Sequence, residues 1–289
     1  MKKIILFILV ILCIIIGINF ITPKEKSTKK TTNTKKTEVK DERLKELDYI
    51  NEKIKYFKEE NIDRYIKYHK ENTDLDMKDV VIRVNLNLDK PYYSVTEKTP
   101  YQNKDYILVN KYIYMDSDYV PDNLEDLDLS YSRSGMKLVK SAKVNLEKMI
   151  QAAKNDGYTI RVMSSFRSYE YQVNLYNKYV ASDGKDAADT YSARPGFSEH
   201  QTGLCVDIDD GKISYTNFES SPSFKWMEEN AQEYGFILRY PKNKTDITGY
   251  TYESWHYRYV GKKIATYIKK HNITFDEYYA MYLDDQTSS

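Results

Sequence analysis

The sequence predicts an α+β domain over residues 91–280, preceded by a membrane helix, a disordered tether and a short helical module, and followed by a tail over 281–289. After residue 91, short β-branched and aromatic runs alternate with longer segments of helical period. Residues 1–22 are almost wholly apolar, whereas residues 23–40 are crowded with lysine and threonine. A chain of 289 residues is long enough for one substantial domain with a small appendage.

Residues 1–22 indicate a signal anchor that crosses a membrane once. Met1-Lys-Lys precedes an almost uninterrupted apolar run from Ile4 to Ile21, and about eighteen apolar residues can span a bilayer. A removed signal peptide, the alternative, has a shorter apolar core and a small-residue cleavage site, and no such site follows this run. Leu12 before Cys13 also disfavours lipoprotein processing.

Residues 23–40 lack an apolar period, and their lysines repel one another, which predicts an extended, disordered tether. These lysines outnumber Lys2 and Lys3 at the start of the apolar run. The positive-inside rule would therefore place the following domain in the cytoplasm.

The helical module spans residues 41–90. The spacing of Leu44, Leu47, Ile50, Ile54, Phe57, Ile62, Tyr65 and Ile66 is helical with a break near Asn61. It predicts two short helices packed as a hairpin. Thr73 is expected to cap a further helix that carries Val80 and Val81.

Within 91–280, the expected elements follow from period and from turn signals. Strands or edge segments are expected at Pro91–Val95 and Tyr106–Asn110, and strands at Tyr158–Met163 and Phe236–Tyr240. Helices are expected over 136–155, 170–180, 224–235 and 262–270. Residues 183–191 form either a loop or a short helix.

Composition excludes one class of partner and one kind of crosslink. The formal net charge is +1, so a basic surface that holds nucleic acid is not expected. The chain has two cysteines, and Cys13 lies in the apolar segment, so Cys205 has no disulfide partner in the rest of the chain.

A metal site is indicated by His200, Asp207 and His256 together with Glu253. Three protein ligands of these types leave a fourth position for water, as in catalytic rather than structural zinc sites. Glu253 lies three residues before His256, close enough to act as the general base for that water. The chain has four histidines, and the other two, His69 and His271, lie among charged residues and are expected at the surface.

The spacing Ser198-x-His200-x-x-Gly203-x-x-x-Asp207 and Glu253-x-x-His256 resembles the motifs of the VanY-type zinc D-Ala-D-Ala carboxypeptidases. These belong to the lysostaphin, D-Ala-D-Ala metallopeptidase and hedgehog-like superfamily. The resemblance extends from about Asn85 to about Lys270 and includes Val109-Asn-Lys111, Tyr119–Leu124 and an Arg-Ser-x-x-x-Gln segment. It implies a small antiparallel sheet flanked by helices that carries a zinc site.

By matching position, the resemblance implies further roles and a substrate. Arg167 and Gln172 would hold the substrate's terminal carboxylate and polarise the scissile carbonyl, and Ser198 would line the pocket. The expected activity is removal of the C-terminal D-alanine from peptidoglycan stem peptides with one Zn²⁺ per chain. The alternatives are an L,D-carboxypeptidase, an endopeptidase of the same fold, or a wall-binding protein without hydrolysis. Wall substrate lies outside the cell, so we expect a single-pass membrane protein with an extracellular catalytic domain, or a secreted one if the N-terminal segment is cleaved.

Four further residues near the motifs have plainer interpretations. Cys205 stands where the family usually has alanine, and we interpret it as a small buried residue. Glu199 is expected to orient its neighbours, Trp255 to lie in the core, and Arg194 either to pair with a surface carboxylate or to take part in the site.

Overall fold

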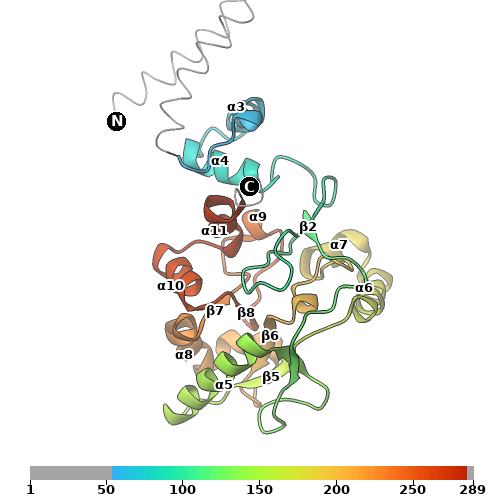
Figure 1. The fold of residues 1–289 in the computed structure, drawn as a ribbon, viewed down its shortest axis with the longest axis vertical. Coiled ribbons are helices and arrows are strands. Elements are labelled where there is room, and N and C mark those ends of the chain that lie inside the picture. Colours follow the sequence, from blue (N-terminus) through green and yellow to red (C-terminus); the bar gives the residue numbers. More distant parts are fainter. Residues whose placement is uncertain (1–53, 285–289) are drawn as a thin grey trace, which may run out of the picture. The chain divides into compact units, whose positions relative to one another are not determined.

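A four-stranded antiparallel sheet in the order β5-β6-β8-β7 lies at the centre of the fold (Figure 1). The computed structural model describes residues 54–284. The strands are β5 (Arg161–Ser164), β6 (Cys205–Asp209), β7 (Phe236–Leu238) and β8 (His256–Tyr259). The expected antiparallel sheet is confirmed, and β5 and β7 fall within or beside the strands expected at 158–163 and 236–240.

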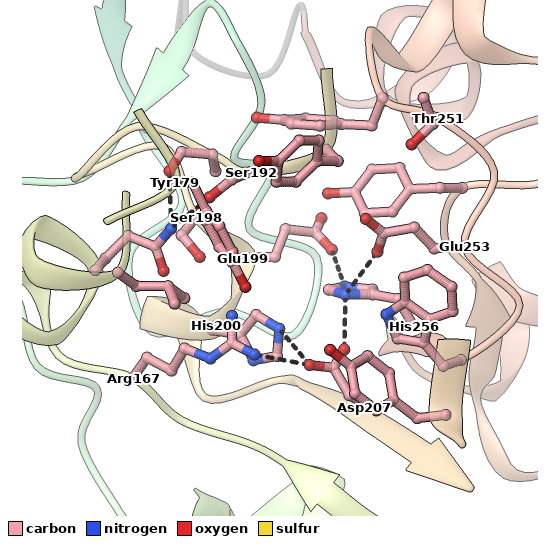
Figure 2. A pocket seen from close by; sticks show the side chains of 18 of the residues that line it. Arg167, Tyr179, Ser192, Ser198, Glu199, His200, Asp207, Thr251, Glu253 and His256 are labelled. Carbon is pink, nitrogen blue, oxygen red and sulfur yellow. Dashed lines mark hydrogen bonds and ion pairs between the residues drawn. The ribbon is translucent and has the colours of Figure 1, made fainter. Parts of the chain in front are cut away.

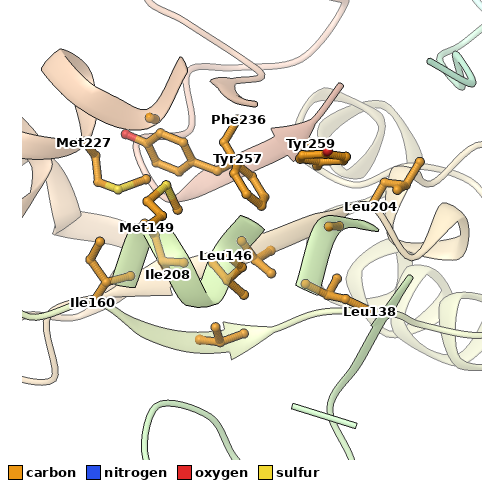
Figure 3. Close-up of a cluster of buried hydrophobic side chains, with 14 of the residues drawn as sticks. Leu138, Leu146, Met149, Ile160, Leu204, Ile208, Met227, Phe236, Tyr257 and Tyr259 are labelled. Carbon is orange, nitrogen blue, oxygen red and sulfur yellow. The ribbon is translucent and has the colours of Figure 1, made fainter. Parts of the chain in front are cut away.

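The two faces of this sheet have different chemistry because successive side chains on a strand point to opposite sides. Val206 and Ile208 of β6, with Tyr257 and Tyr259 of β8, belong to the main hydrophobic core. Helix α5 (Lys140–Asn155) covers this face, and Figure 3 shows Leu146 and Met149 of α5 among the core side chains of the strands. The opposite face therefore carries the alternate residues of β6 and β8, which are polar.

Helices surround the sheet. They are α6 (Tyr169–Asp183), α7 (Lys185–Tyr191), α8 (Pro222–Asn230), α9 (Thr245–Thr248), α10 (Lys262–His271) and α11 (Phe275–Tyr282). Short 3-10 helices occur at Glu59–Asn61, Glu199–Thr202, Tyr215–Ser220 and Ala231–Tyr234. The helices expected at 136–155, 170–180, 224–235 and 262–270 are confirmed with shifted ends, and residues 185–191 adopt the helical alternative. Helix α11 was not expected; a capping box between Thr274 and Glu277 begins it.

Two expected strands are wrong. Residues 91–95 form a turn, in which Tyr93 has a φ of 63° that an extended strand does not allow. Residues 106–110 are irregular, since the Asn110 side chain accepts hydrogen bonds from the backbone N–H groups of Tyr112 and Ile113 and so forms a turn. Aromatic and β-branched composition favoured strands in both places, but within residues 54–284 pairing of this part of the chain is confined to β1 (Glu97–Lys98) and β2 (Ile113–Tyr114).

Two small sheets lie outside the central one. β1 (Glu97–Lys98) pairs in parallel with β2 (Ile113–Tyr114), and β3 (Leu124–Asp126) pairs antiparallel with β4 (Lys137–Val139). Strand β4 occupies the start of the segment expected to be helical, so the helix begins at residue 140 rather than 136.

The N-terminal module is described from residue 54 onward. It contains α3 (Ile62–Glu71) and α4 (Met77–Asn85), which pack against each other, and α4 also contacts α11. Helix α3 begins directly after Asn61, the position of the expected break, and Asp76 rather than Thr73 caps α4. These helices belong to the same compact unit as the sheet.

The expected signal anchor, the tether and the first part of the module lie outside the described residues, as do residues 285–289 of the expected tail. Within residues 54–284, no helix combines the length and the apolar character needed to cross a membrane.

Candidate active site

The polar face of the sheet brings two of the expected ligands together. Asp207 of β6 and His256 of β8 are directly paired in the antiparallel register, so their side chains lie next to each other on one face. Asp207 Oδ1 lies 3.2 Å from His256 Nδ1. Both side chains are buried, at 7% and 5% exposure.

His200 reaches the same point from the 3-10 helix before β6. Its Nδ1 is 2.7 Å from the backbone carbonyl of Ser165, and its Nε2 is 3.4 Å from Asp207 Oδ2. Gly203 ends that helix with φ +66°, and a Cβ there would lie 2.8 Å from Leu124 Cδ2. Glycine is therefore required where the chain turns from His200 into the strand of Asp207. Figure 2 shows both imidazoles facing the Asp207 carboxylate.

This cluster fits a divalent metal. Among the described residues, Asp207 Oδ1 is a buried oxygen without a hydrogen-bond partner, although an imidazole nitrogen lies 3.2 Å away. Burial and the positive charge of Arg167 lower the pKa of His200, but negative charge on Cys205 and Asp207 outweighs them and raises that pKa to about 9. The site thus favours positive charge between its imidazoles, and nitrogen and carboxylate donors suit zinc.

Glu253 lies beside the cluster, as expected. Its Oε2 is 3.6 Å from His256 Nδ1, and the side chain is 9% exposed. Burial raises the pKa of Glu253 to about 7, with Asp207 adding to the effect and the nearby cationic groups opposing it. A carboxyl group with a pKa near neutrality can both take up and release a proton.

Arg167 follows the end of β5 and borders the cluster. Its Nε donates to Ser164 Oγ at 2.9 Å and its Nη2 donates to Asp207 Oδ2 at 2.8 Å. The side chain remains 20% exposed, so the guanidinium is held in place but accessible from the cavity.

Gln172 and Ser198 lie in the cavity wall. Gln172, in the first turn of α6, donates from Nε2 to the carbonyl of Ala193 at 2.8 Å. Its Oε1 has no partner among the described residues. Ser198 is buried and lines the same cavity.

The cavity has a volume of about 300 Å³, enough for the end of a peptide. Arg167, Gln172, Ser198, His200, Asp207, Glu253 and His256, all named from the sequence, line it. The remaining wall includes Tyr191, from the stretch 183–191 that the sequence places at the mouth of the site. It also includes residues that the sequence did not assign to the site: Leu175, Tyr179, Ser192, Ala193, Tyr215, Thr216, Tyr240, Tyr250 and Thr251. Trp255 packs against the core and also lines the cavity, in edge contact with Tyr215.

Three further residues named from the sequence remain: Cys205, Arg194 and Glu199. Cys205 is fully buried, as expected, but its thiol and the two imidazoles offer ligand atoms within 4.8 Å of one another. Arg194 pairs with Asp189 at 2.6 Å, so it acts as an ion-pair partner. Glu199 is fully buried against two guanidiniums and His256. No spacing rule linked Glu199 to those partners, which lie about 40 to 60 residues away in sequence.

Comparisons with known proteins agree with this geometry. Residues 135–262 match the family model described as VanY: D-alanyl-D-alanine carboxypeptidase. The chain is 39% identical over 206 residues to "Putative carboxypeptidase YodJ" of Bacillus subtilis (strain 168), covering 67% of this chain and 76% of that protein.

Two solved structures are similar. One is the LdcB LD-carboxypeptidase, with a TM-score of 0.60, 39% identity, and coverage of 64% of this chain and 90% of that one. The other is a mutant of the vancomycin resistance D,D-pentapeptidase VanY in complex with Zn(II), with a TM-score of 0.51, 35% identity, and coverage of 60% and 98%. The chain belongs to the VanY family of D-alanyl-D-alanine carboxypeptidases.

Proposed function

We propose that this chain is a zinc-dependent carboxypeptidase that removes the C-terminal D-alanine from peptidoglycan stem peptides. The observation that supports it most is the position of Glu253, whose carboxylate lies 3.6 Å from His256 Nδ1 at the floor of the cavity. A protein that only bound wall polymer would have no need for a buried base beside its metal ligands. The non-hydrolytic alternative is therefore disfavoured.

His200 Nε2, Asp207 and His256 Nδ1 would hold one zinc ion. The unpartnered Asp207 Oδ1 and the two imidazole nitrogens that face Asp207 support this ligand set. Bound there, zinc supplies Lewis acidity and lowers the pKa of a coordinated water towards neutrality.

The protein's own groups then have separate tasks. Glu253 takes the proton of the attacking water and passes it to the leaving amine nitrogen. Arg167 is always charged, and Ser164 and Asp207 fix its orientation, so it stabilises the oxyanion or the substrate's terminal carboxylate. Gln172 and Ser198 fix the substrate's end.

An L,D-carboxypeptidase is the second candidate, favoured by the similarity to the LdcB LD-carboxypeptidase. The two activities differ in whether the residue before the terminal D-alanine is a D- or an L-centre. A stem pentapeptide and a stem tetrapeptide are therefore incubated with the purified protein, with zinc and with a chelator, and the products are weighed by mass spectrometry.

Zinc-dependent loss of one alanine from the pentapeptide alone is the expected result. Loss from the tetrapeptide alone would move the assignment to the L,D class. Cleavage of neither peptide, with an internal bond cut in intact peptidoglycan, would indicate an endopeptidase.

The proposal places the catalytic domain outside the cell, anchored by residues 1–22. The apolar run supports the anchor, although the lysines of 23–40 favour the opposite orientation. Protease added to intact cells should digest the catalytic domain if it is extracellular. Protection until the cells are lysed would place the domain in the cytoplasm.

A further inference from the structure

A closed group of buried charges lies behind His256. It consists of Glu199, Arg239, Arg258 and Asp276, and each side chain is at most 1% exposed. Arg239 Nε donates to Glu199 Oε1 at 2.7 Å, and Arg258 Nη1 donates to the same oxygen at 2.9 Å. Two guanidiniums and two carboxylates balance in charge, as buried ions must.

Glu199 uses its two oxygens differently. Oε1 accepts from both guanidiniums, which leaves Oε2 facing His256 Nε2 at 3.4 Å. A carboxylate next to one imidazole nitrogen holds the proton on that nitrogen and leaves a lone pair on the other. The other nitrogen of His256 is Nδ1, which faces Asp207. When a metal takes the place of a proton between Nδ1 and Asp207, the contact with Glu199 keeps the remaining proton of His256 on Nε2.

Arg239 connects Glu199 to a distant helix. Its Nη1 donates to Asp276 Oδ2 at 2.5 Å, and Asn110 Nδ2 donates to Asp276 Oδ1 at 3.0 Å. Asp276 lies in the first turn of α11, outside the segment that matches the family model. The position of Arg239, and hence of the Glu199 oxygen that it contacts, depends on this carboxylate.

We propose that Arg239 and Asp276 are positioning residues of the metal centre, acting through Glu199 to hold His256 with Nδ1 towards the metal. This inference rests on the proposed zinc-dependent function. Without the Asp276 charge, Arg239 would retain Glu199 as its one carboxylate partner. The Arg239 guanidinium would then attract the Glu199 carboxylate more strongly. The balance of charge beside His256 would become more positive, which opposes binding of a cation.

The test measures zinc affinity by competition with a chromophoric chelator, independently of catalysis. Glu199→Gln should bind zinc about 10- to 100-fold more weakly, as is typical when the partner of a metal-binding histidine is removed. Asp276→Asn should weaken binding in the same direction. Glu277→Gln is the matched control, because Glu277 lies next to Asp276 and caps α11 but contacts Lys244 and Thr274 instead of Arg239.

A double mutant separates positioning from general stability. If Asp276 acts through Glu199, Asp276→Asn should have almost no further effect on zinc affinity once Glu199 has been replaced by Gln. The change in that background should be less than about twofold, which is the usual error of a double-mutant comparison. Full additivity of the two losses would overturn the proposal. Wild-type zinc affinity in Asp276→Asn would overturn it as well.

Arg239→Lys, a charge-conserving variant, provides a second test if Asp276→Asn does not fold. Arg239→Lys keeps the buried charge but loses the planar fork that contacts both carboxylates, so zinc affinity should fall. Unchanged affinity in Arg239→Lys would refute the positioning role. If the wild-type protein itself bound no zinc, the proposed function would fail, a result distinct from zinc binding that is insensitive to these variants.

Discussion

Lys111 is a buried lysine whose deprotonation should make the protein more stable in mild alkali. Its side chain is 3% exposed; Nζ donates to the carbonyl of Asp189 at 2.5 Å and lies 4.5 Å from the ring centres of Tyr92 and Tyr250. Burial lowers the pKa of Lys111 from 10.5 to about 8, against the attraction of Asp189 and with a small contribution from Arg194. The folded protein therefore loses this proton at a lower pH than the unfolded chain.

The sign and size of the effect follow from proton linkage. Between pH 8 and 10.5 the unfolded chain binds the Lys111 proton and the folded protein does not, so the free energy of unfolding rises with pH. For these two pKa values, the rise from about pH 7.5 to about pH 9.5 is about 2 kcal/mol. Burial raises the pKa of Tyr92 and Tyr250 and brings that of Tyr93 to about 12, so these phenols stay protonated in the folded protein.

The assay compares wild type with Lys111→Met by urea denaturation at the two pH values, with chelator present in both so that metal binding does not contribute. The difference between the two proteins isolates Lys111, because all other titrating groups are shared. Wild type should gain about 2 kcal/mol relative to the variant on going to the higher pH. An equal pH dependence in both proteins, or a relative loss by wild type, would refute the reasoning.

Three further changes concern catalysis directly. Glu253→Gln should bind zinc yet lose roughly 10²- to 10⁴-fold in kcat/KM. In the wild type, kcat/KM should rise with pH up to about 7, because burial raises the pKa of the Glu253 carboxyl to that value and the base must be ionised. If kcat/KM did not change with pH in this range, Glu253 would be excluded as the base. Arg167→Ala should lose about a hundred- to a thousandfold in turnover while metal analysis still finds zinc; unchanged turnover would remove Arg167 from the mechanism. Cys205→Ala should keep zinc and activity, and loss of metal from that variant, or a sulfur-to-cobalt absorption band in the cobalt-substituted wild type, would identify the thiol as a ligand.

The sequence located the residues of the site because their contacts are set by local geometry. His200 and Asp207 are joined by one turn and one strand, and Gly203 marks the turn. Glu253 and His256 are three residues apart. Alternation on β6 predicts that Cys205 shares the face of Asp207, and the structure places its thiol by the imidazoles.

The support of the site could not be predicted in this way. Glu199 contacts Arg239, which directly follows β7, and Arg258 and His256 of β8, and Arg239 in turn contacts Asp276 of α11. Only the order of strands in the sheet brings the residues around Glu199 together. Composition predicted strands at residues 91–95 and 106–110 that do not form. Strand propensity reflects the residue types alone and does not show whether a neighbouring strand can pair with them. Tyr93, with a positive φ, stacks on Arg194 at 3.8 Å instead of joining a sheet.

The segment from Asn110 to Lys111 connects both sides of the cavity, although no chemistry takes place there. Asn110 donates to Asp276 on the side of the metal ligands, whereas Lys111 donates to Asp189 just before the wall formed by Ser192 and Ala193. Because these residues are adjacent, a shift of the segment would alter zinc affinity and substrate binding together. Removal of the Lys111 amine alone would act only on the wall and raise KM. Asn110→Ala should affect both quantities, so the two variants can show whether the segment acts as one rigid support.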